Sequence, residues 1–222
     1  YEALPLPFID SKGNFGKVYS RDMAYAASRY TEAKLAPICR ELFDDIDKDT
    51  VDFIPNYDNS MQEPALLPVS FPTILTTPNQ GIAVGMASNI CSFNLAELCS
   101  TTVALMKDAK HDISTTMPAP DFVGGGQILY DEAQMRDIFE NGRGSVKVRA
   151  RYAAVPGENM IEITQIPPTT TVEAIMDKIA ELVKAGKIKE ISDMRDETDL
   201  NGLKLTLDLK RGVDADKLMA KL

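Results

Sequence analysis

The residues best suited to covalent chemistry are Arg29 and Tyr30, which are adjacent in the sequence. A tyrosine phenol has a pKa of about 10, so activating it at neutral pH requires about 4 kcal/mol of differential stabilisation. A guanidinium, a metal-bound phosphate or a general base can share that task. Attack on a phosphodiester would leave a phosphotyrosyl ester, and an arginine can hold a non-bridging phosphate oxygen. The two residues alone still favour a half-buried structural tyrosine beside a solvated arginine.

The elements around this pair are expected to leave the phenol accessible. Proline is favoured in the first turn of a helix and is disruptive later, so Pro37 predicts an amphipathic helix over residues 36–48. The apolar residues of this helix recur at a spacing of four: Ile38, Leu42 and Ile46. Residues 29–35 then form a short extended segment or loop. Tyr30 should therefore be exposed rather than fixed in a helical core.

A series of short motifs runs in order along nearly the whole chain. The motifs are Asp10, Gly13-Asn14-Phe15-Gly16, Arg29-Tyr30-Thr31-Glu32, Leu35, Thr50-Val51-Asp52-Phe53, Asn56-Tyr57-Asp58, Gly81-Ile82-Ala83-Val84-Gly85-Met86-Ala87, Pro120-Asp121-Phe122, Gly142-Arg143-Gly144 and Arg195-Asp196-Glu197. In this series the chain resembles the A subunit of the bacterial type IIA DNA topoisomerases, DNA gyrase and topoisomerase IV. One short motif could arise by chance, whereas an ordered series of this length is very unlikely to do so.

This resemblance implies the breakage–reunion region of an ATP-dependent type II topoisomerase, which changes DNA supercoiling or linkage. Tyr30 would form a transient 5′-phosphotyrosyl link during double-strand passage, and Arg29 would assist at the scissile phosphate. The A subunit of the family forms a homodimer, and an A2B2 complex acts on double-stranded DNA. In the family, Mg²⁺ and ATP are bound by the B subunit. We therefore expect no cofactor or metal on this chain, and no activity from the chain alone.

Two other functions remain open from the residues themselves. A non-catalytic DNA-binding or scaffold module would use Tyr30 only structurally, whereas a nuclease would need acidic metal ligands. The densest acidic group lies on and just past the end of the predicted helix and comprises Asp44, Asp45, Asp47 and Asp49. We interpret this group as a solvated surface rather than a metal site.

The segment from Gly81 to Gly85 is the second candidate for contact with a partner. Its glycines would let the backbone approach another surface closely. The resemblance assigns Ile82 to a wedge inserted between DNA base pairs, with Gly81 beside it as a DNA-binding residue. Apolar wedges of this kind kink a duplex. The alternative is an ordinary isoleucine buried beneath a loop.

Four basic residues are predicted to lie on one face of a strand: Arg143, Lys147, Arg149 and Arg151. We take Arg143 and Lys147 as the candidate DNA-binding residues among them. A solvated outer face of the sheet, partly paired with Glu162, is an equally good interpretation.

Composition limits the remaining possibilities. The net charge of −9 argues against simple coating of DNA, although basic and acidic residues nearly balance in residues 1–43. No apolar run is long enough to span a bilayer, so no membrane association is expected. The three cysteines are widely spaced, with no Cys-x-x-Cys pair, which favours reduced thiols in a cytoplasmic protein. The single histidine, His111, has polar neighbours and is expected to be a solvated loop residue.

The patterns together predict an α+β chain in two parts. Residues 1–66 are interpreted as a partial winged-helix domain that carries the tyrosine, and residues 67–222 as an α/β tower domain; both names come from the resemblance. The family has a long helical segment ahead of this region, of which only Tyr1-Glu2-Ala3-Leu4 resembles the end. We therefore expect part of the active site to lie outside this chain.

Individual elements follow from periodicity and from capping residues. Helices are predicted over residues 95–106 with Asn94 as N-cap, over 131–140, over 172–185, and from 215 onward. Strands are predicted over residues 146–151, around 161–163 and over 203–209, and residues 69–75 are rich in β-forming residues. Residues 1–20 are interpreted as a turn and short hairpin, residues 51–66 as a loop, and residues 76–81 as a turn.

Overall fold

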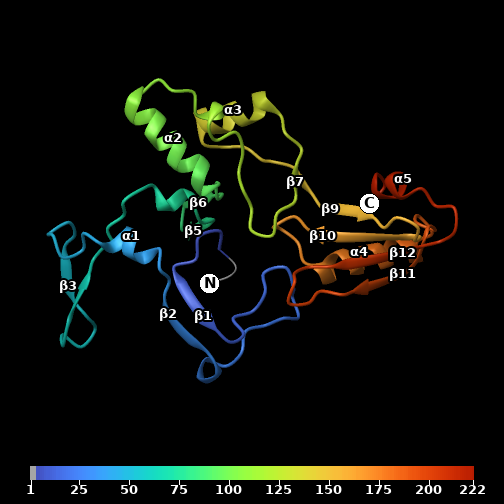
Figure 1. The fold of residues 1–222 in the computed structure, drawn as a ribbon, viewed down its shortest axis with the longest axis horizontal. Helices are drawn as coiled ribbons and strands as arrows, with labels where there is room; N and C mark the ends of the chain where they lie inside the picture. Colours follow the sequence, from blue (N-terminus) through green and yellow to red (C-terminus); the bar gives the residue numbers. More distant parts are fainter. Residues whose placement is uncertain (1–3) are drawn as a thin grey trace. The chain divides into compact units, whose positions relative to one another are not determined.

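The contacts of the chain divide it into two units. The computed structural model describes residues 4–222, which are drawn as a ribbon in Figure 1. Unit 1 contains the residues up to Phe15 together with Ala26–Asp121, and unit 2 contains Gly16–Tyr25 together with Phe122–Leu222. Helices and strands are mixed in the chain, which confirms the α+β class.

The finer domain interpretation stays a prediction. The two units do not test the assignment of residues 1–66 to a winged-helix domain or of residues 67–222 to a tower domain. The resemblance of Tyr1-Glu2-Ala3 to the end of a helix lies outside the described residues.

The first two strands of unit 1 pair with each other across a long separation in sequence. β1 (Ile9–Lys12) is antiparallel to β2 (Glu32–Leu35), with Asp10 opposite Lys34. The predicted local hairpin in residues 1–20 is therefore wrong. The backbone groups of β1 are instead satisfied by a strand about twenty residues further along the chain.

The helix after β2 is much shorter than predicted. α1 spans Cys39–Phe43 rather than residues 36–48. Each amide at the start of the helix donates a hydrogen bond to the carbonyl three residues earlier, as Cys39 does to Ala36. A run of turns follows Phe43. The carboxylates that begin at Asp44 oppose the negative end of a helix dipole, which disfavours extension.

Two hairpins follow in unit 1, where the sequence had predicted other structures. β3 (Phe53–Pro55) pairs with β4 (Gln62–Pro64) inside the predicted loop 51–66. Residues 69–75, predicted to be β-rich, contain instead a 3-10 turn at Thr73–Leu75. Pro68 and Pro72 cannot donate to a strand ladder, which accounts for this difference.

The second hairpin begins inside the predicted turn 76–81. β5 (Asn79–Ala83) pairs with β6 (Met86–Ile90), and Val84-Gly85 connects them. Gly85 adopts a φ of 79°, which glycine tolerates without strain.

Helix predictions succeeded where a cap accompanied the periodicity. In unit 1, α2 spans Leu95–Lys107, and the Asn94 side chain accepts hydrogen bonds from the amides of Ala96 and Glu97. In unit 2, α3 spans Glu132–Asn141 and ends at Gly142, whose φ is 66°.

Unit 2 is built on an antiparallel sheet of four strands in the order β11-β12-β10-β9. A separate two-stranded sheet, β7–β8, precedes it in the sequence. The sheet strands are β9 (Arg151–Ala154), β10 (Met160–Gln165), β11 (Ile191–Asp196) and β12 (Leu205–Leu209), and the pair consists of β7 (Gln127–Ile128) and β8 (Val148–Arg149). The helices of the same part are α4 (Val172–Lys184) and α5 (Ala215–Met219).

The core of unit 2 lies between this sheet and α4. Its fully buried members include Ile161, Leu205 and Leu207 from the strands and Val172 and Ile179 from the helix. Within residues 4–222, the helices are all too short or too polar to cross a membrane.

Candidate active site

Tyr30 ends a 3-10 turn that spans Ser28–Tyr30 in unit 1. The amide of Tyr30 donates to the carbonyl of Ala27 at 3.0 Å, and the Thr31 amide and hydroxyl both donate to the carbonyl of Ser28. The Tyr30 side chain is 68% exposed. It is therefore not the half-buried aromatic of the structural alternative, and its phenol is open to a partner from solvent.

Arg29 is already in contact with the phenol. Its Nη2 donates a hydrogen bond to Tyr30 Oη at 3.3 Å, and its guanidinium carbon lies 4.6 Å from the centroid of the Tyr30 ring. The stacking uses the negative face of the ring, and the hydrogen bond favours negative charge on the oxygen. The arrangement therefore places a cation and a hydrogen-bond donor at the phenol of Tyr30.

A glycine supports the Tyr30 turn from the neighbouring strand end. Gly13 follows β1 with a φ of 98°, and a Cβ at this position would lie only 2.8 Å from the carbonyl oxygen of Tyr30. The adjacent Asn14 carbonyl accepts a hydrogen bond from the amide of Ala26 at 2.9 Å. The Gly13-Asn14 motif thus packs backbone to backbone against the tyrosine segment.

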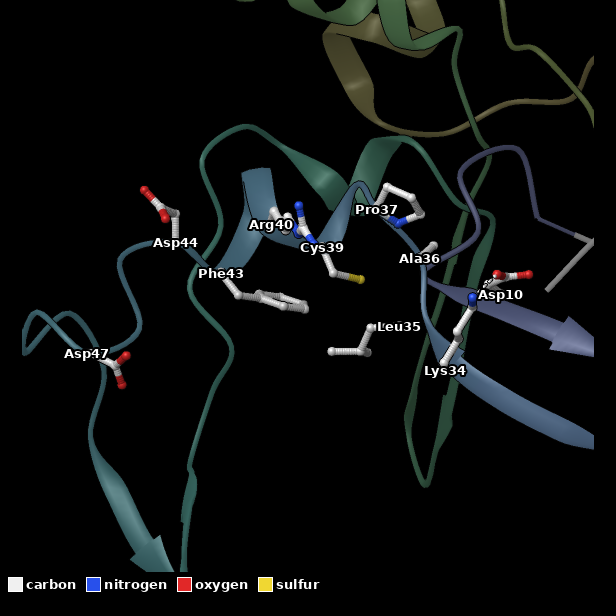
Figure 2. Close-up of a pocket in the computed structure, with 10 residues that line it drawn as sticks. All are labelled: Asp10, Lys34, Leu35, Ala36, Pro37, Cys39, Arg40, Phe43, Asp44 and Asp47. Carbon is white, nitrogen blue, oxygen red and sulfur yellow. Dashed lines mark ion pairs between the residues drawn. The ribbon is translucent and has the colours of Figure 1, made fainter.

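A hollow of about 750 Å³ lies beside the far end of β2. Its walls come from β1, β2, α1 and the turns that follow α1, and an ion pair of 3.3 Å joins Lys34 to Asp10 on one side (Figure 2). Tyr30 and Arg29 do not line it. Among residues 4–222, no group of three or more His, Cys, Asp or Glu side chains is placed to hold a metal ion.

Ile82 lies near the tip of the β5–β6 hairpin and is 84% exposed. This exposure excludes the alternative of an isoleucine buried beneath a loop. Val84 and Met86 at the same tip are also exposed, so the hairpin presents a short apolar end. Gly81 lies close to its cross-strand partner, since a Cβ there would come within 2.8 Å of Ser88 Oγ. Of these three apolar side chains, the sequence analysis proposed only Ile82 as a DNA contact. The largely apolar run from Ile82 to Met86 could have indicated Val84 and Met86 as well.

The basic residues of unit 2 do not share one strand. Arg143 lies in the loop after α3, and Lys147 directly precedes β8. Arg149 donates from Nε to Gln127 Oε1 at 3.1 Å. The suggested pairing with Glu162 is wrong, because that carboxylate forms an ion pair with Lys204 at 2.9 Å. Arg143 and Lys147 are exposed, and within residues 4–222 neither forms an ion pair.

Comparison with known proteins places this chain in a family. The family model that describes the A subunit of DNA gyrase/topoisomerase IV matches residues 2–222, and the chain belongs to this family. The A subunit of DNA gyrase from Granulibacter bethesdensis is 42% identical over 226 residues, which cover 99% of this chain and 24% of that protein. Its counterpart from Ureaplasma parvum is 43% identical over 220 residues, covering 96% of this chain and 26% of the relative. The chain therefore spans about a quarter of the length of the curated relatives it matches.

Proposed function

We propose that this chain is part of the breakage–reunion region of an ATP-dependent type II DNA topoisomerase, with Tyr30 as the covalent nucleophile. The observation that carries the proposal is an exposed tyrosine in hydrogen-bond contact with Arg29, in a chain that belongs to the family of gyrase and topoisomerase IV A subunits. The winged-helix and tower assignments and a cytoplasmic location belong to the same proposal.

The reaction is a phosphoryl transfer to the phenol. Tyr30 Oη attacks a DNA phosphorus and loses its proton to a base, while the bond from phosphorus to the 3′ oxygen breaks. The 3′ oxygen leaves as a hydroxyl after protonation, and the 5′ end remains on the tyrosine. Reversal of these steps reseals the strand without ATP. Arg29 offsets negative charge on the phosphate oxygens as it develops.

The remaining components are assigned by family membership. We propose a homodimer of A subunits in an A2B2 complex, so that two tyrosines cut opposite strands of one duplex. The B subunit is proposed to bind Mg²⁺ and to bind and hydrolyse ATP. The exposed tip at Ile82, with Gly81 beside it, is proposed to enter the DNA stack, and Arg143 and Lys147 to contact phosphates.

The decisive experiment traps the covalent complex. The complete A subunit is combined with the B subunit, duplex DNA and Mg²⁺, denatured during cleavage, and mapped by peptide sequencing. We expect Tyr30→Phe to bind DNA and to give no adduct, because it keeps the ring and loses only the nucleophilic oxygen. Tyr25→Phe removes another exposed phenol, shortly before Tyr30 in the sequence, and should leave the adduct unchanged.

Recovery of the DNA on a residue other than Tyr30 would refute the assignment. Wild-type protein that binds DNA but forms no adduct would favour the non-catalytic DNA-binding or scaffold module. Cleavage that survives Tyr30→Phe would favour a nuclease.

A further inference from the structure

The segment Gly16–Tyr25, here called the strap, belongs to unit 2 by its contacts, although both of its ends continue into unit 1. Within unit 2 the strap lies against the N-terminal end of α4. The carbonyl of Tyr19 accepts a hydrogen bond from the amide of Val172 at 2.9 Å, and the Tyr19 side chain packs against the unit 2 core. The Val172 amide has no partner within its own helix, so the strap satisfies it.

A single carboxylate holds the next three residues of the strap. Glu173 in the first turn of α4 accepts a hydrogen bond from the Ser20 hydroxyl on one oxygen. Its other oxygen accepts from the amide of Arg21 at 3.0 Å, and the amide of Asp22 lies 3.4 Å from the first. The Arg21 guanidinium also forms an ion pair with Asp177 at 3.4 Å. The strap is thus fixed to α4 at several points, most of them on Glu173.

The ionisation of Glu173 reflects these bonds. Partial burial by itself would raise the pKa of this carboxyl, but the Ser20 hydroxyl and the nearby amides outweigh burial and lower the pKa to about 2. A carboxyl with a depressed pKa contributes stability that is fully present above its ordinary pKa of 4.5 and is lost as the pH falls toward 2. The strap is therefore fully held near neutral pH.

One end of the strap continues into the Tyr30 turn, and the other continues back to Gly13, which lies against that turn. The amide of Ala26 donates to the carbonyl of Asn14 at 2.9 Å, which closes the chain on itself just outside the strap. On one side of this closure Gly13 lies against the carbonyl of Tyr30, and on the other side Ala27 begins the turn. A displacement of the strap is therefore passed to the backbone of Tyr30 through the chain from Ala26 to Ala27 on one side and through the non-covalent contact of Gly13 on the other.

We propose that Glu173 is a positioning residue for Tyr30, which holds the strap on α4 and so fixes the two chain ends that carry the nucleophile. Glu173 does not touch the reacting atoms; it acts through the strap. This inference rests on the proposed function, since the position of Tyr30 matters for rate only if Tyr30 is the nucleophile. Misplacing a reacting group by about 1 Å can cost on the order of a hundredfold in rate.

The test uses the complete A subunit with the B subunit, duplex DNA and Mg²⁺. We expect Glu173→Gln to slow formation of the Tyr30 adduct about tenfold or more, with unchanged affinity for DNA. Trypsin should also cut faster after Lys17 and Arg21 in the strap. Glu181→Gln is the matched control, because it removes a carboxylate from the same helix that pairs with Lys178 at 2.9 Å rather than with the strap.

Ser20→Ala tests the same contact from the strap side and keeps the proposal open to refutation if the Glu173 variant does not fold. The double variant should lose less rate than the product of the two single losses, because the two changes share the hydrogen bond between Ser20 and Glu173. A normal cleavage rate in Glu173→Gln, or an equal loss in Glu181→Gln, would overturn the proposal. Unchanged tryptic cutting of the strap would overturn it as well. Absence of any Tyr30 adduct in the wild type would instead refute the proposed function, and the proteolysis would still report on the strap.

Discussion

The contact between Arg29 and Tyr30 shows how one side chain can serve two roles in the proposed reaction. A guanidinium has five N–H donors in a fixed plane. One of them is used on Tyr30 Oη in this structure. The others remain available to a phosphate oxygen, so Arg29 can contact the phosphate without releasing the phenol. A lysine would offer a point charge without this planar geometry.

Because the Ile82 side chain is exposed, truncating it should affect DNA binding without affecting the stability of the fold. Ile82→Ala should change the free energy of unfolding by no more than about 0.5 kcal/mol, as is usual for a surface site. In the complete enzyme it should reduce DNA bending and cleavage, since the apolar wedge is lost. Thermal unfolding and a DNA-bending assay measure the two effects.

The matched control for Ile82 is Ile163→Ala, which truncates an isoleucine that is only 3% exposed. Truncation there should cost about 2–5 kcal/mol of stability. Normal bending by the Ile82 variant would contradict the wedge proposal.

At the scale of elements, the position of the nucleophile depends on backbone contacts rather than on a packed core. β1 and β2 place Gly13 and the Tyr30 turn next to each other, and the paired side chains across these strands are exposed. Exposed ion pairs contribute little to stability. The close approach at Gly13 is therefore the most sensitive local feature of the site.

Gly13→Ala is expected to disturb this approach. The new Cβ would lie 2.8 Å from the carbonyl oxygen of Tyr30, and the positive φ adds roughly 1–2 kcal/mol of strain. The turn must shift, so the cleavage rate should fall in addition to the loss of stability. Denaturant unfolding and adduct formation in the complete enzyme measure the two losses.

Gly157→Ala is the control for backbone strain alone. Gly157 has a φ of 81°, but a Cβ there would have no neighbour within 4 Å. This variant should lose a similar amount of stability and keep its cleavage rate. Equal cleavage rates in the two glycine variants would show that the approach at Gly13 does not matter for the nucleophile.

At the scale of the whole molecule, the chain holds the proposed nucleophile but only a part of the proposed machinery. It spans about a quarter of the length of its curated relatives. We therefore predict that the isolated 222-residue chain, mixed with duplex DNA and Mg²⁺, forms no Tyr30 adduct. The measurement is denaturation followed by detection of protein-linked DNA, with the complete A2B2 complex as the positive control. Adduct formation by the isolated chain would contradict the assignment of metal and ATP functions to the B subunit.

The sequence by itself determined the elements whose signals are local. α4 was predicted from the spacing of Ile175, Ile179 and Leu182, and α2 from its periodicity and its Asn94 cap. The alternating leucines from Leu203 to Leu209 predicted the strand that the structure shows as β12. Family membership was also readable from the ordered motifs, because residue type and order along the chain are sequence properties. The choice of Tyr30 over the other tyrosines rests on the same motifs and stays a prediction.

Only the tertiary structure decided which segments meet. The partner of β1 and the docking of the strap on Glu173 both depend on contacts between residues far apart in sequence. β11 was not predicted because it is an edge strand of mostly polar residues, which show no strand pattern. Its backbone hydrogen bonds to β12 make it a strand. The stacking of Arg29 on Tyr30 is likewise a matter of side-chain conformation. Such contacts are set by packing and by hydrogen-bond satisfaction across the fold, which no local pattern encodes.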